Sequence, residues 1–111
     1  MEKNELIKKY ELMMIIDAKL SNEEKELILK TVVEAINKSG GKVINSRVWL
    51  EKHKLTFSVQ RCQEGTYYLI NFESETPAVN TIHSNLRLNE KILRFVIIRV
   101  EAHQFLEPVR S

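Results

Sequence analysis

One stretch near the N-terminus, residues 9–16, constrains the fold of this chain more than any other. Its sequence, KYELMMII, is apolar at nearly every position. Successive side chains of a strand point to opposite faces, which here places Tyr10, Leu12, Met14 and Ile16 on one face and Met13 and Ile15 on the other. A strand with one face in water alternates apolar and polar residues, whereas a strand that is apolar on both faces is covered on both. We therefore interpret residues 9–16 as the central strand of a sheet whose second face also requires cover.

Length and composition limit the chain to one domain of ordinary character. It has 111 residues, of which 43% are hydrophobic and 29% are charged. No segment approaches the ~18 consecutive apolar residues of a membrane span, and the polar N-terminus lacks the apolar core of a signal peptide. The single cysteine, Cys62, cannot form an internal disulfide, which is typical of a reducing compartment. A net charge of +2 is too small to indicate nucleic-acid binding by itself.

The rest of the chain predicts two helices and three more strands. Ser21 and Glu24 form a capping box that starts one helix, and a glycine pair at 40–41 ends it. Thr76 is expected as the N-cap of the second helix, with Pro77 at its first position. The second strand is expected at residues 42–50 and resumes at 55–59, after a basic patch that bends or interrupts it. A turn over residues 61–65 leads to the third strand at 66–73, and the last strand is expected at 92–100.

This order, β-α-β-β-α-β, predicts an α+β protein with a ferredoxin-like fold. Right-handed crossovers place both helices on the same face of a four-stranded antiparallel sheet, with the first and third strands in its centre. We expect this domain to cover residues 9–101. Residues 1–8 are expected to form an N-terminal arm and residues 102–111 a C-terminal tail.

The face of the sheet without helices is the predicted partner-binding site. Contiguous apolar patches of its size usually mark an interface. The residues expected on it are Met13, Ile15, Trp49, Tyr67, Leu69, Val96 and Ile98. The alternative is that the C-terminal tail covers this face. If a partner covers it, Leu69→Asp is expected to break partner binding and leave the fold intact.

Three segments resemble a known family. They are KKYE at residues 8–11, GTYYLINFE at 65–73 and LRLNEKILRFV at 86–96. Together they make the chain similar, over about residues 8–101, to the bacterial small-subunit ribosomal protein six family. The second strand departs from that family, which usually has a Trp-Gly kink, a basic pair and then Leu-Ala-Tyr-Pro-Ile. Here residues 49–59 are WLEKHKLTFSV, without the glycine or the proline, which indicates a divergent member.

The resemblance implies a function as well as a fold. Such proteins are structural, have no enzymatic activity, and bind the central domain of small-subunit ribosomal RNA together with the eighteenth small-subunit protein. It therefore implies RNA and that protein as partners, a location on cytoplasmic ribosomes or those of an organelle, and no cofactor, membrane or small-molecule substrate. With the resemblance, the basic residues at loops and strand ends become predicted RNA contacts, because lysine and arginine neutralise phosphates. They are Lys8, Lys9, Lys52, Lys54, Arg87, Lys91 and Arg94. Without it, a solvated charged surface with interspersed acids would be the better explanation.

Two other classes of function were weighed against this one. Acylphosphatases share the topology, and they are similar to one another in a loop of glycines and an arginine that holds phosphate. The corresponding loop of this chain, residues 17–20 (DAKL), contains neither glycine nor arginine. His53, His83 and His103 lack metal-ligand spacing, and one cysteine does not complete a site. The remaining alternative is a self-dimerising ferredoxin-like module that binds a ligand or regulates, and that buries the helix-free face against a second copy.

Overall fold

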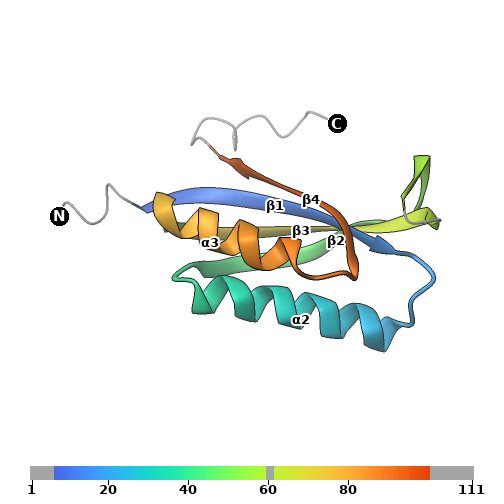
Figure 1. Cartoon of the computed structure of the whole chain (residues 1–111), viewed down its shortest axis with the longest axis horizontal. Helices are drawn as coiled ribbons and strands as arrows, with labels where there is room; N and C mark the ends of the chain where they lie inside the picture. The colour runs from blue at the N-terminus through green and yellow to red at the C-terminus, as the bar shows by residue number, and fades with distance from the viewer. Residues whose placement is uncertain (1–6, 60–61, 101–111) are drawn as a thin grey trace.

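The computed structural model describes residues 7–59 and 62–100 and confirms the predicted order of elements. Figure 1 shows the chain folded into one sheet with two helices beside it. The elements are β1 (Ile7–Asp17), α2 (Asn22–Lys38), β2 (Lys42–Val59), β3 (Cys62–Glu75), α3 (Thr76–Arg87) and β4 (Ile92–Arg99). β1 therefore begins inside the predicted N-terminal arm, residues 1–8. The predicted boundary between the domain and the C-terminal tail, at residues 101–102, lies outside the described residues and stays a prediction.

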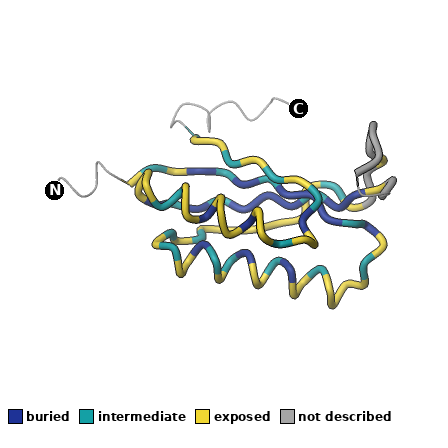
Figure 2. Tube along the Cα trace, in the orientation of Figure 1, coloured by how far each residue is buried: buried dark blue, intermediate teal, exposed yellow. Residues whose placement is uncertain are grey.

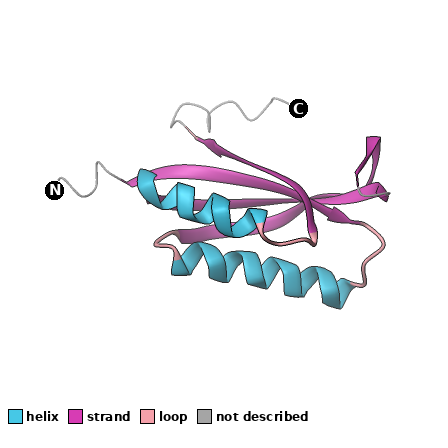
Figure 3. Cartoon of the chain, viewed as in Figure 1, coloured by secondary structure: helices cyan, strands magenta, loops and turns pink. Residues whose placement is uncertain are grey.

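The sheet has the predicted ferredoxin-like topology. Its strand order is β2-β3-β1-β4, with every neighbouring pair antiparallel, so β1 and β3 are the central strands. Both helices lie on one face of the sheet, and the opposite face carries no helix (Figure 3). We call this second face the open face. Among the described residues, no helix is long and apolar enough to cross a membrane.

Of the two predicted helix N-caps, that of α2 is confirmed and that of α3 is wrong. At α2, the Ser21 hydroxyl accepts a hydrogen bond from the Glu24 backbone N–H at 3.1 Å, and the Glu24 carboxylate accepts one from the Ser21 N–H at 3.1 Å. Gly40, just past α2, has a φ of 101°, which favours glycine. At α3 the N-cap is Glu75 and not Thr76. The Thr76 hydroxyl instead lies 3.3 Å from the Tyr10 hydroxyl, a contact that spans the sequence and that local patterns do not reveal.

The hairpin of β2 and β3 is longer than predicted. β2 runs without interruption through the basic patch, and four shifts in its register with β3 take the place of the expected break. Gly65 is not in a turn: it lies within β3, opposite Asp17 of β1 and His53 of β2. A partly buried hydrogen bond of 2.7 Å from the Thr66 hydroxyl to the Glu51 carbonyl supports this part of the ladder.

The core lies between the sheet and the two helices, along the buried segments in Figure 2. Its aromatic side chains are stacked: the rings of Tyr10 and Phe72 have centroids 5.5 Å apart. Tyr10 and Tyr68 both face the helices. The buried cluster consists of Tyr10, Leu12, Met14, Ile16, Ile28, Val32, Ile36, Tyr68, Ile70, Phe72, Ile82, Leu86 and Ile92.

The two faces of the sheet differ in how much they contribute to folding. Ile70 is fully buried under the helices, whereas Ile98 on the open face is 51% exposed. We expect Ile70→Ala to lower the free energy of unfolding by about 2–5 kcal/mol, because it leaves a cavity in the core. The matched change Ile98→Ala should cost less than about 1 kcal/mol. Urea titration of both variants tests this, and equal losses would contradict the assignment of faces.

Tyr68 makes the stability of the fold sensitive to alkaline pH. Burial raises the pKa of its phenol above 10.0, and the negative charges of Glu51 and Glu26 raise it further. The neutral phenol is thus favoured in the folded state, while the unfolded chain ionises near a pH of about 10. The contribution to stability is complete below that pH and is lost as the pH rises from there through the raised folded pKa.

We therefore expect the melting temperature of the wild-type chain to fall more between pH 9 and pH 11 than that of Tyr68→Phe, which has no phenol to ionise. Lysine titration contributes equally to both proteins, so the difference between them isolates Tyr68. Parallel losses in the two proteins, measured by circular dichroism, would show that Tyr68 does not cause the pH dependence.

Candidate protein and nucleic-acid interfaces

The strand register brings the predicted partner-binding residues together on the open face. On β1, Met13 lies between Leu69 of β3 and Val96 of β4. The next position of β1 on the same face, Ile15, lies between Tyr67 and Arg94. Directly opposite residues on one face of a sheet have Cβ atoms about 4.5–5.5 Å apart. These side chains therefore form one contiguous surface, which Ile98 extends along β4.

β2 completes this surface along its other edge. The ring of Trp49 meets the ring of Tyr67 edge-on, with centroids 5.9 Å apart. Arg47 lies opposite Leu69, and Asn45 lies opposite Asn71. All seven predicted residues thus belong to one patch that crosses the four strands, and Arg47 joins it at the edge.

The patch is exposed at its edges and buried in its centre. Trp49 is 51% exposed and Val96 is 49% exposed, but Ile15 is only 6% and Leu69 only 8% exposed although no helix covers them. Both lie in central strands, where side chains of the neighbouring strands surround them. Leu69→Asp would therefore place a charge at a buried position, and the expectation that the fold tolerates it is wrong. The half-exposed residues on β4 offer the better test.

Toward the end of the sheet where β1 begins, the open face becomes polar. Glu11 lies between Asn71 and Ile98, and Lys9 lies opposite Glu73. An N–H of the Asn71 amide donates to the amide oxygen of Asn45 at 3.1 Å. The open face is thus apolar in one half and carries carboxylates and amides in the other.

Sequence reasoning missed charged residues of the open face, among them Glu11 and Arg47. Glu11 could have been found from the two-residue period of β1, since it shares a face with Met13 and Ile15. Arg47 could not, because the register shifts within β2 obscure which of its residues share a face. Only the pairing with Leu69 places Arg47 beside the apolar patch.

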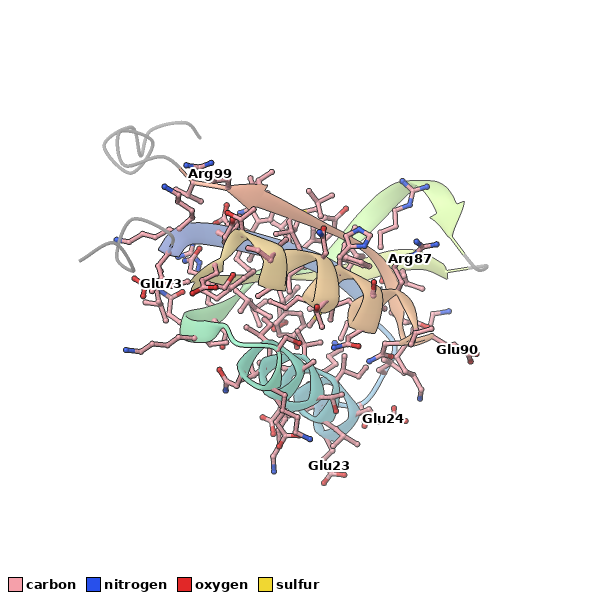
Figure 4. The ribbon with its side chains drawn as sticks, turned by 60° about the vertical axis from the view of Figure 1, so that its left-hand side comes forward. Glu23, Glu24, Glu73, Arg87, Glu90 and Arg99 are labelled. Carbon is pink, nitrogen blue, oxygen red and sulfur yellow. The ribbon has the colours of Figure 1, made fainter. Side chains whose placement is uncertain are left out.

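The predicted RNA contacts separate into two groups at opposite ends of the sheet. Lys8 and Lys9 lie where β1 begins, while Arg94 lies near the other end, opposite Ile15. Six residues of β1 separate the two ends, a span of about 20 Å. Figure 4 shows the same division: Arg99 and Glu73 lie toward one end, and Arg87 and Glu90 toward the other.

The group at the end of α3 is the denser one. Arg87 is the last residue of α3, Lys91 follows in the turn, and Arg94 is on β4; all three are exposed. Arg87 and Arg94 line one open hollow of about 870 Å³ that curves around the start of β4. Within it, the rings of His83 and Phe95 have centroids 4.9 Å apart.

The remaining basic residues of the prediction lie on β2. Lys54 is exposed and lies opposite Glu64, so a carboxylate is close to its charge. Lys52 is on the same strand, and its side chain is outside the described part of the structure. In residues 7–59 and 62–100, no group of three or more histidine, cysteine or acidic residues could hold a metal ion. The geometry of the described residues is that of binding surfaces.

Comparisons with known proteins place the chain among ribosomal proteins of one family. The family model of ribosomal protein S6 matches residues 9–99. A small ribosomal subunit protein bS6 from Micrococcus luteus is 39% identical over 92 residues, which cover 83% of this chain and 90% of that protein. The bS6 of Rhodopirellula baltica is 32% identical over 100 residues, which cover 90% of this chain and 70% of the relative.

The fold also matches a solved structure. The crystal structure of 30S ribosomal protein S6 from Thermotoga maritima superimposes with a TM-score of 0.73 at 23% sequence identity, covering 91% of this chain and 94% of that one. The S6 family consists of structural components of the small ribosomal subunit without enzymatic activity, as the resemblance implied. The match over residues 9–99 and the identity with the bS6 relatives show that this chain belongs to the ribosomal protein S6 family.

Proposed function

We propose that this structural component of the small ribosomal subunit binds the central domain of small-subunit ribosomal RNA together with the eighteenth small-subunit protein, on cytoplasmic ribosomes. The observation that carries the proposal is the open face, whose apolar patch crosses all four strands and is half exposed at Trp49, Val96 and Ile98. A monomeric protein rarely exposes a contiguous apolar patch of this extent.

The apolar composition of the open face favours a protein over RNA as its occupant. Its charges are mixed, because its two carboxylates share the face with four basic residues: the acidic residues are Glu11 and Glu73, and the basic residues are Lys9, Lys42, Arg47 and Arg94. Covering the apolar patch with a protein surface removes it from water, at about 25 cal/mol for each Å² of apolar area. The large rings of Trp49 and Tyr67 are typical of protein interfaces, where an apolar body and a polar edge are both used.

RNA binding is assigned to the end of the sheet where α3 meets β4. Arg87, Lys91 and Arg94 lie within eight residues of sequence and are exposed there. Arginine suits phosphate because its planar guanidinium can donate two parallel hydrogen bonds. Lys8 and Lys9 are weaker candidates, because Glu73 lies directly opposite Lys9 and compensates its charge.

The partner interface can be tested with Val96→Lys. A lysine at this exposed edge position stays solvated in the free chain, but it would lose its water under a partner that covers the apolar patch. We expect the affinity for the purified eighteenth small-subunit protein of the same organism to fall by at least about tenfold, with the melting temperature little changed. Isothermal titration calorimetry provides the measurement.

The matched control is Leu27→Lys, which replaces another exposed apolar residue, 63% exposed, but on α2. It should bind the partner as the wild type does. If Val96→Lys also binds normally, the open face is not the partner interface. If the wild-type chain forms a homodimer that ignores the partner and RNA, the self-dimerising alternative is correct.

The RNA interface can be tested with Arg87→Ala and Arg94→Ala. Each is expected to weaken binding to a fragment of the central domain of small-subunit ribosomal RNA, measured by filter binding with the partner protein present. Each should also reduce the slope of log K against log salt concentration by about 1, since one phosphate contact is lost. Lys30→Ala on the exposed side of α2 is the control. Unchanged salt slopes in both arginine variants would exclude phosphate contacts at this end.

A further inference from the structure

One carboxylate occupies a position on the open face that the apolar patch does not explain. Glu11 is in the middle of β1, a central strand, with Asn71 of β3 on one side and Ile98 of β4 on the other. It is half-buried in the free chain, and its neighbour two residues along the strand is Met13. An occupant that covers the open face therefore covers Glu11 as well.

Covering this carboxylate has an energetic consequence. A carboxylate that loses water without a compensating partner is strongly destabilised, so buried charges are paired in proteins. Within residues 7–59 and 62–100, the Glu11 carboxylate accepts no hydrogen bond and forms no ion pair. The cross-strand amide of Asn71 directs an N–H the other way, to Asn45 at 3.1 Å.

In the described part of the chain, two lysines lie on the open face at this end of the sheet. They are Lys9, two residues before Glu11 on β1, and Lys42 on β2, and both lie directly opposite Glu73. An opposite position on a neighbouring strand is closer, at about 4.5–5.5 Å between Cβ atoms, than the next same-face position along one strand, at about 7 Å. Lys9 therefore lies nearer to Glu73 than to Glu11. Arg47 and Arg94 lie opposite Leu69 and Ile15, farther along the sheet.

We propose that Glu11 determines the specificity of the open face by pairing with a lysine or arginine of the protein that docks there. The inference rests on the proposed function, because it requires a protein partner on this face. It adds the chemistry of that partner. The partner places apolar side chains over Met13 and Val96, and a lysine or arginine over Glu11, the neighbouring position of β1 on the same face. A segment with an acidic or apolar residue at that point would leave the carboxylate buried and unpaired, and is excluded for that reason.

The test is Glu11→Gln, which keeps the shape of the side chain and removes its charge. The purified eighteenth small-subunit protein of the same organism is titrated into the full chain by calorimetry at low and at physiological salt. We expect affinity to fall by about tenfold or more, because the partner's cation loses its counter-charge in a desolvated site. We also expect the salt dependence of the affinity to become weaker. Glu34→Gln, on the exposed side of α2, should bind as the wild type does.

The possible outcomes separate this inference from the proposed function. If the wild-type chain does not bind the partner, both fail. If the wild type binds and Glu11→Gln stays within twofold of it, the proposed function stands and the inference is overturned. It is also overturned if Lys9→Gln weakens binding as much as Glu11→Gln and the double variant is no weaker, since Lys9 would then be the counter-charge.

Discussion

The handedness of the two crossovers is the constraint on which the rest of this structure depends. Each β-α-β unit is right-handed, so both helices lie on one face of the sheet and none is left for the other. β1 is nevertheless apolar on both faces, with Leu12 and Met14 under the helices and Met13 and Ile15 on the open face. The described part of the chain therefore folds around one core and retains a second apolar surface that neither helix covers.

The side chains of that second surface are more exposed at its edges than in its centre. Ile15 and Leu69 are already buried by their neighbours in the free chain, while Trp49, Val96 and Ile98 are half exposed at the edges. The central residues thus contribute to the stability of the monomer, and the edge residues hold most of the apolar area that a partner can remove from water. If the proposed partner docks here, this division lets the sheet be stable before the partner binds, and substitutions in the centre of the patch are expected to affect folding and binding together.

Periodicity predicted most of this fold, because a period of two assigns strand residues to faces and the capping box and glycine pair mark the ends of α2. What it missed depends on contacts between distant segments. The local sequence predicted Thr76 as the N-cap of α3, but its hydroxyl lies beside the hydroxyl of Tyr10, which is 66 residues away in sequence. The face of Arg47 depends on register shifts between β2 and β3. The burial of Leu69 depends on strands at both of its sides.

β2 departs from the usual family pattern directly after Trp49, and the register of the strand shifts at the same place. The glycine expected after this tryptophan is replaced by Leu50, yet the register with β3 still shifts between Val48 and Leu50. The shift inserts one residue into β2 and bends the strand, which is the effect of a β-bulge and does not require glycine in every form. Since Trp49 remains against Tyr67 at the edge of the open face, the altered segment keeps the ring where an interface can use it. In this chain the shift forms without glycine, and Trp49 contributes its ring to the edge of the open face.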